Sequence, residues 1–130
     1  MTTFLSPLLR GAPDQHRLVN ERTGLSVADH LLTAFDSATR RTGLLRHTSL
    51  ADGVAMIIAP TNAIHTFRMR FAIDVAFVAK DGRIVKIRPA LGPWRLAAAF
   101  GGYAVVELPA GALARAGTHT GDRLVVAERQ

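Results

Sequence analysis

The sequence contains no cysteine among its 130 residues. This absence excludes disulfide bonds, thiol nucleophiles and zinc or iron–sulfur sites with cysteine ligands. The five histidines stand at positions 16, 30, 47, 65 and 119, and no two are close enough in sequence to favour another kind of metal site. We therefore expect neither a metal nor a cofactor.

Long hydrophobic runs are also absent, since no stretch approaches the roughly 18 apolar residues that cross a bilayer. The N-terminal segment lacks the basic region of a signal peptide, and Ser6 and Pro7 interrupt its apolar part. We expect a cytoplasmic protein without a membrane span. Residues 1–14 contain two prolines and no periodicity, which predicts a flexible N-terminal arm before a single domain at 15–130.

Negative charge is scarce: 10 acidic residues stand against 16 basic ones, and only Lys80 and Lys86 among the bases are lysines. The arginines are scattered along the chain, and no aromatic residues are interleaved with them as a stacking surface. Basic charge alone supports only salt-sensitive, non-specific contact with phosphates. We do not expect nucleic acid as the main partner, and a non-specific nucleic-acid or anionic-surface binder is kept only as an alternative.

One helix is predicted over residues 27–41. Ser26 can serve as its N-cap, with Asp29 three positions later as an acidic partner. An apolar stripe follows at helical spacing, formed by Val27, Leu31, Phe35 and Ala38. Gly43 would end this helix, which is long enough to cover one side of a sheet.

Strand patterns fill most of the remaining chain, at 54–59, 64–69, 74–80, 83–88, 103–108 and 123–127. Residues 89–102 have no clear period and are expected to form a loop. Asp81-Gly82 favours a two-residue type I′ turn between two of the strands. One helix followed by strands predicts an α+β, β-rich compact single domain, with a mostly antiparallel, barrel-like or rolled sheet covered by one long N-terminal helix.

The turn at Asp81-Gly82 also fixes a register. It places Asp74 at the rim of the apolar face that carries Ala76 and Val78. A carboxylate at this position should have a partner, because an unpaired charge beside an apolar surface is costly.

Several short motifs follow one another as in a known bacterial and archaeal family, between about Arg17 and Val126. They are Gly43-Leu44-Leu45-Arg46, Ile64-His65-Thr66-Phe67-Arg68-Met69-Arg70-Phe71, Ile73-Asp74, Asp81-Gly82, Glu107-Leu108-Pro109-Ala110-Gly111 and Gly121-Asp122. In this order they resemble the DUF192 family, a domain of unknown function. Many members look to carry Trp-Met where this chain has His65-Thr66, so the chain is similar to a histidine-bearing branch. The resemblance implies a compact, β-rich single domain and no particular activity.

Polar residues at predicted strand positions suggest a site. In an extended strand Arg68, Arg70 and Asp74 share one face. Together with Glu107 they would form a polar cleft at the sheet end, where the guanidinium groups bind a carboxylate or phosphate. Trp94 would anchor a flat ligand or a partner protein. The structural alternatives are an ion pair of Arg70 with Asp74 or Glu107, and a tryptophan packed as a lid over the sheet.

Common catalytic motifs are absent from the sequence, including a Gly-x-Ser-x-Gly elbow and a phosphate-binding loop. The leading hypothesis is therefore a small non-enzymatic module that binds a small anionic ligand or a protein partner. The alternative is an enzyme that uses Asp74 or Glu107 with His65 as acid and base. His65 is a secondary candidate for the site, since it could equally be packed against the core.

Overall fold

The computed structural model describes residues 2–42 and 49–129. In this part of the chain the helical elements are short: α1 (Ser6–Arg10), the 3-10 turn η1 (Pro13–Gln15), α2 (Ser37–Thr42) and α3 (Ala112–Arg115). The strands are β1 (His16–Asn20), β2 (Ser26–Ala28), β3 (His30–Ala34), β4 (Val54–Ile58), β5 (Ala63–His65), β6 (Ile73–Val78), β7 (Ile84–Leu91), β8 (Leu96–Ala98), β9 (Ala104–Pro109) and β10 (Leu124–Glu128).

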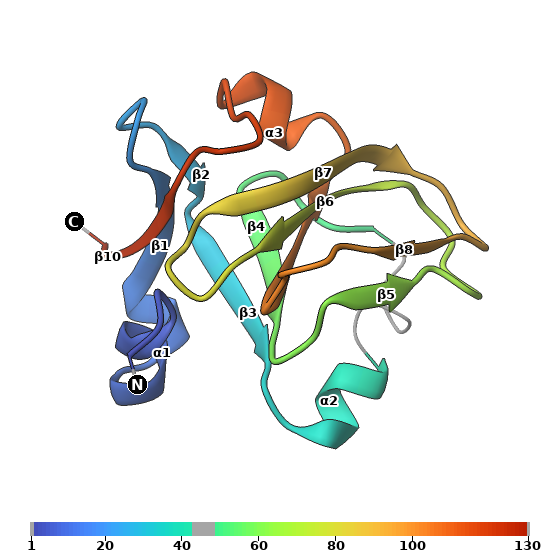
Figure 1. Ribbon diagram of the computed structural model, residues 1–130, viewed down its shortest axis with the longest axis horizontal. Helices are drawn as coiled ribbons and strands as arrows, with labels where there is room; N and C mark the ends of the chain where they lie inside the picture. Colours follow the sequence, from blue (N-terminus) through green and yellow to red (C-terminus); the bar gives the residue numbers. More distant parts are fainter. Residues whose placement is uncertain (1, 43–48, 130) are drawn as a thin grey trace.

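A five-stranded sheet with the order β3-β4-β9-β6-β7 forms the centre of the molecule. Strand β3 runs parallel to β4, and the other neighbours are antiparallel. The three-stranded sheet β10-β1-β2 lies to one side of it and the two-stranded sheet β5-β8 to another, as Figure 1 shows. Two buried apolar clusters result, one on each face of the central sheet.

Burial on both faces explains the continuous apolar runs in the central strands. Every residue of β6 and β9 is buried. Along β6, Ala76 and Val78 contribute to the first cluster, whereas Val75 and Phe77 contribute to the second. This alternation follows from the period of two along a strand. The second face is covered by the inward side of the β5-β8 sheet, where Ala97 is buried and Ile64 packs against the cluster.

The long helix predicted over residues 27–41 is wrong. These residues form β2 and β3, and α2 has only six residues. Val27 lies in β2, Leu31 pairs with Ala55 of β4, and Ala38 lies in α2, so the stripe interpreted as one helix face is divided among different elements. Ser26 donates its hydroxyl to the Asp29 carboxylate at 2.7 Å instead of capping a helix. Apolar residues spaced three and four positions apart over so short a segment are compatible with a helix or with strands. Pairing of β3 with the apolar strand β4 decides in favour of a strand.

The N-cap of α2 is Asp36, which accepts a hydrogen bond from the Thr39 N–H at 2.8 Å. The predicted helix end at Gly43 and the family motif Gly43-Leu44-Leu45-Arg46 lie outside the described residues. None of the described helices is long and apolar enough to cross a bilayer.

The barrel-like closure predicted for the sheet is also wrong. The described strands form three sheets, and an isolated bridge between Arg83 and Arg123 links the start of β7 to the start of β10. Because the central strands are apolar on both faces, they are buried by layers on each side and the sheet does not curl into a closed barrel.

The connection between β6 and β7 is a hairpin, but its turn is longer than predicted. The Ala79 N–H donates to the Arg83 carbonyl at 2.8 Å, so three residues lie between the last paired positions. Gly82 has φ +93°, and a Cβ there would collide with the Leu124 carbonyl. Ala76 pairs with Ile87 and Val78 pairs with Ile84, with a register shift between Phe77 and Val78.

The segment expected to be a flexible arm contributes to the first apolar cluster. Leu5, just before α1, is 1% exposed, and Leu8, in α1, is 6% exposed. The Phe4 N–H donates to the Lys80 carbonyl at 2.9 Å, which attaches this segment to the β6–β7 hairpin. Its contribution to stability is therefore open to measurement.

Candidate functional site

The two-stranded sheet β5-β8 has a buried inward side and an exposed outward side. Ala63 pairs with Ala98, and His65 pairs with Leu96. Between them, Ala97 points inward and is buried in the second cluster. Further exposed residues adjoin both strands, and we call the outward side together with these residues the ribbon face. It consists of Ala63, His65, Phe67, Trp94, Leu96, Ala98 and Phe100.

The ribbon face is unusually apolar for an exposed surface. Trp94 is 61% exposed, Leu96 69% and Phe100 fully exposed. Small soluble proteins rarely expose large contiguous apolar patches, and such patches mark sites of interaction. We therefore treat the ribbon face as the candidate functional surface.

Three rings form a column at one end of the ribbon face. The His65 and Phe67 ring centroids are 4.9 Å apart with an interplanar angle of 29°. Phe67 and Trp94 follow at 5.8 Å and 25°. Trp94 ends the column and remains largely exposed, so a further flat ring could stack on it.

Thr66 fixes the two segments that carry these rings, and its side chain is completely buried. Its hydroxyl donates to the Gly92 carbonyl at 2.7 Å and accepts from the Arg95 N–H at 2.9 Å. Its backbone N–H donates to the Arg95 carbonyl at 2.8 Å, and its carbonyl accepts from the Trp94 N–H at 3.0 Å. These bonds bring Phe67 and Trp94 together although they are far apart in sequence.

Backbone strain is concentrated at the same end of the molecule. Among the described residues, the non-glycine residues with positive φ are Arg68 (67°), Ala90 (46°) and Trp94 (62°). A left-handed conformation at a non-glycine residue costs on the order of 1–3 kcal/mol and persists where the surroundings impose it. All three lie in the segments that flank the ring column, which is a second, independent indication of a functional site.

The segments that build the ribbon face carry positive charge and no negative charge. Residues 61–73 and 84–103 contain no acidic residue, and their basic residues are Arg68, Arg70, Lys86, Arg88 and Arg95. The Lys86 Nζ donates to the Ala98 carbonyl at 2.8 Å, which places this amine beside β8. The four guanidinium groups form no hydrogen bond or ion pair with any described residue. They are therefore available to an anionic ligand.

Asp74 lies elsewhere, with only 1% of its surface exposed. Its Oδ1 accepts from the Ala90 N–H at 2.9 Å, and its Oδ2 accepts from the Leu113 N–H at 3.1 Å. The partner expected for this carboxylate is thus the backbone at the end of β7 and in α3, and no ion pair with Arg70 is formed. Asp74 positions the strained Ala90 and does not face the ring column.

Glu107 is buried on the opposite face of the central sheet from Asp74. Its cross-strand neighbours are Met56 and Val75, which both belong to the second cluster. The Oε1 atom has no hydrogen-bond partner among the described residues. Burial raises the pKa of the Glu107 carboxyl to about 7. This group is held in an apolar layer between the central sheet and the β5-β8 sheet.

His65 is exposed rather than packed in the core, and its Nδ1 accepts from the Phe67 N–H at 3.3 Å. It has no hydrogen bond with Asp74 or Glu107. The acid–base arrangement considered from the sequence is therefore not assembled in this conformation. Its ring instead belongs to the aromatic column.

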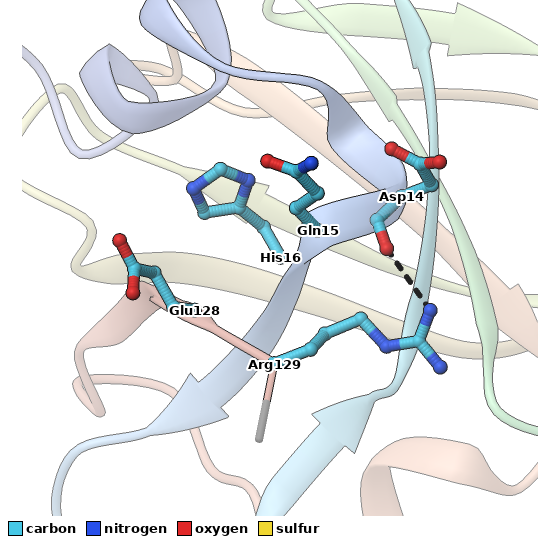
Figure 2. Close-up of a pocket in the computed structure, with 5 residues that line it drawn as sticks. All are labelled: Asp14, Gln15, His16, Glu128 and Arg129. Atoms are coloured by element: carbon cyan, nitrogen blue, oxygen red, sulfur yellow. Dashed lines mark hydrogen bonds between the residues drawn. The ribbon is translucent and has the colours of Figure 1, made fainter.

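A separate open pocket of about 490 Å³ lies where β1 begins and β10 ends, lined by Asp14, Gln15, His16, Glu128 and Arg129. Figure 2 shows Arg129 reaching toward Asp14, whose carbonyl it contacts at 3.0 Å. The His16 Nδ1 donates to the Ala12 carbonyl at 2.9 Å. The Arg129 and His16 side chains thus have backbone partners within the chain, and no cluster of potential metal ligands occurs among the described residues.

Of the predicted site residues, Trp94 lies in the ring column and Arg68 is the chain neighbour of the column residue Phe67, whereas Asp74 and Glu107 are buried in the central sheet. No contact joins Arg70 to these residues in the part of the chain that the structure describes. Sequence reasoning missed Phe67, Leu96 and Phe100 as surface residues. The even spacing of Trp94, Leu96 and Phe100 was the available signal, but the alanines between Leu96 and Phe100 obscured the strand.

Two solved structures are similar to this chain. One is a protein of unknown function from Novosphingobium aromaticivorans DSM 12444, with a TM-score of 0.72 and 26% identity over 84% of this chain and 81% of that one. The other, from Sinorhizobium meliloti 1021, is described as a candidate transcription regulator, with a TM-score of 0.71 and 25% identity over 84% of this chain and 89% of that one. No curated protein matches the chain significantly.

The sequence resemblance is confirmed at the level of the family. The motifs that span the β-rich core fall within the range that the family model covers, including the turn at Gly121-Asp122 and the strand that carries Glu107. The match extends over residues 19–126, which is most of the chain. This chain belongs to the DUF192 family, whose description is that of an uncharacterized ACR.

Proposed function

We propose that this protein is a binding module that takes a flat, anionic ligand at the Trp94 end of the ribbon face. The observation that carries the proposal is the exposed column of His65, Phe67 and Trp94. A ring of the ligand would stack on Trp94, and Arg68 or Arg70 would contact its anionic group. The ligand is a small molecule with these two features or a partner that presents them.

Two of the sequence candidates take different roles in this proposal. Asp74 is a positioning residue, because it holds the backbone of Ala90 near the segment that leads to Trp94. Glu107 lies beneath the β5-β8 sheet and contacts no ligand. The description of the Sinorhizobium meliloti protein is one reason to include nucleotides among the ligands that are tested.

Trp94 is the only tryptophan in the chain, so its fluorescence reports directly on the proposed site. Titration with adenosine 5′-monophosphate should quench this fluorescence in a saturable manner. Adenosine, which has the ring without the charge, should bind more weakly, and inorganic phosphate should produce no quenching.

Variants distinguish specific binding at the site from non-specific attraction between the ligand and basic side chains. Removing one charge-assisted hydrogen bond should weaken binding by about tenfold, so Arg68→Ala and Arg70→Ala should both show this loss. Arg83→Ala is the matched control, because Arg83 lies on the hairpin at the start of β7 and should change affinity by less than about twofold. Absence of quenching, or equal losses in all three variants, would refute the proposal.

A further inference from the structure

We infer that the ribbon face binds a single-stranded nucleic acid along its length. The nucleobases contact the outward side chains, and the phosphates contact the flanking lysine and arginine side chains. This inference rests on the proposed function and extends it beyond one nucleotide. The feature that carries it is the series of exposed apolar residues from the ring column through Leu96 to Phe100, beside cations that form no ion pair with any described residue.

The geometry of the surface fits an extended polymer. Leu96 and Ala98 of β8 are paired with His65 and Ala63 across the sheet, and both are exposed. Trp94 comes two residues before Leu96 and Phe100 comes two residues after Ala98, so an exposed aromatic residue flanks each end of β8. Aromatic rings therefore stand at both ends of a flat strip, whereas a single mononucleotide would use only one end.

The charges follow the same strip. Lys86 and Arg88 lie on β7, opposite Phe77 and Val75, and so on the face of the central sheet that β5-β8 covers. Lys86 reaches the Ala98 carbonyl at 2.8 Å, in the middle of the strip. Arg68 and Arg95 are the chain neighbours of Phe67 and Trp94 in the ring column, and Arg70 follows Arg68 by two residues. Cations beside exposed rings are the combination that binds single strands without strict sequence preference.

This surface was not visible along the sequence, where the arginines have no interleaved aromatic residues. Phe67 comes from one segment and Trp94 and Phe100 from another, and the bonds of Thr66 join the two. Stacked rings favour a nucleic acid over an acidic protein or an anionic membrane, since neither of these requires near-parallel aromatic planes.

The test is fluorescence anisotropy of labelled oligothymidylates of 3 and 12 nucleotides with the full chain. The 12-mer should bind at least about fivefold more tightly than the 3-mer, because it reaches both ends of the strip. Phe100→Ala should weaken binding of the 12-mer by about fivefold or more, the lower limit expected for loss of one stacked base. Phe100 is fully exposed, so this variant should fold normally.

The salt dependence tests the flanking cations. Each neutralised phosphate of a single strand contributes about −0.7 to the slope of log affinity against log salt. Lys86→Ala and Arg88→Ala should each reduce the magnitude of the slope by about this amount. Leu9→Ala, an exposed leucine in α1 far from the strip in sequence and structure, is the control and should leave affinity unchanged.

The outcomes distinguish this inference from the proposed function. If adenosine monophosphate quenches Trp94 but the two oligonucleotides bind equally and Phe100→Ala has no effect, the extended site is refuted while the mononucleotide site stands. If no quenching occurs, both are refuted. Binding to phosphatidylserine vesicles or to polyglutamate, without binding to the 12-mer, would overturn the inference in favour of a membrane or an acidic protein.

Discussion

Asp74 and Glu107 lie on adjacent strands of the central sheet, but their carboxyl groups point to opposite faces. Asp74 pairs with Leu108, and Glu107 pairs with Val75, so the two acids are offset by one position in register. A shift of one residue along a strand reverses the face of a side chain. The two acids therefore differ in environment: Asp74 accepts two backbone hydrogen bonds, and the Glu107 Oε1 lies in an apolar layer with no hydrogen-bond partner among the described residues.

Glu107 should make the stability of the fold depend on pH. Burial raises its pKa from 4.5 to about 7, so the folded state binds more protons than the unfolded state between these values. Stability should then fall as the pH rises from about 4.5 to 7 and remain lower above that range. Glu107→Gln removes this ionisation. The change that it causes in the free energy of unfolding should be more favourable at pH 8 than at pH 4, by up to about 3 kcal/mol.

Urea denaturation of both proteins at pH 4 and pH 8 measures this difference. The amide of glutamine carries its own cost of burial, which is the same at both pH values and cancels in the comparison. An identical effect of the substitution at the two pH values would contradict the assignment.

Asp74→Asn should destabilise the fold by about 2 kcal/mol, because the new amide group faces a backbone N–H donor in place of a carboxylate oxygen. The measurement is the free energy of unfolding at pH 7. Asp52→Asn is the matched control, since the Asp52 side chain is 94% exposed and its contact with Arg115 is 3.7 Å. If Asp74→Asn and Asp52→Asn lowered the free energy of unfolding by the same amount, the hydrogen bonds of Asp74 would be shown to be unimportant.

Thr66→Val should lower stability by about 1–3 kcal/mol, because the Gly92 carbonyl and the Arg95 N–H lose their partner. It should also shift the emission spectrum of Trp94, since the segment that carries this ring is released. Thr66→Ser keeps the hydroxyl and should retain the native spectrum. A native spectrum in Thr66→Val would mean that other contacts hold the ring column.

The N-terminal segment offers a direct comparison of neighbouring leucines. Leu8→Ala should cost about 2–5 kcal/mol, because it opens a cavity in the first apolar cluster. Leu9 is 67% exposed, and Leu9→Ala should change stability by less than about 0.5 kcal/mol. Thermal unfolding of the two variants checks this. Equal effects would indicate that α1 does not pack as described.

The sequence predicted elements well where burial on both faces produces a clear apolar run, as in β4, β6 and β9. It failed at 27–41, because Val27, Leu31 and Phe35 are compatible with either a helix or strands and only pairing with β4 decides. It also missed β8, since Leu96-Ala97-Ala98 carries little strand propensity of its own.

For the site, residue types were informative but their grouping was not. Trp94, Arg68 and Arg70 were chosen as candidates because each residue type is distinctive in a strand or loop, and their role in binding stays a prediction. Their association with Phe67 depends on the buried hydroxyl of Thr66, a contact between segments that no local pattern contains.

The most direct test of the ribbon face is the change in amide chemical shifts of the isotope-labelled protein when the 12-nucleotide oligothymidylate is added. The account predicts changes in the Trp94 indole and in the amides of residues 63–70 and 92–100, with none around His16 and Arg129. Shifts centred on the His16 pocket, or no change at the indole, would contradict it.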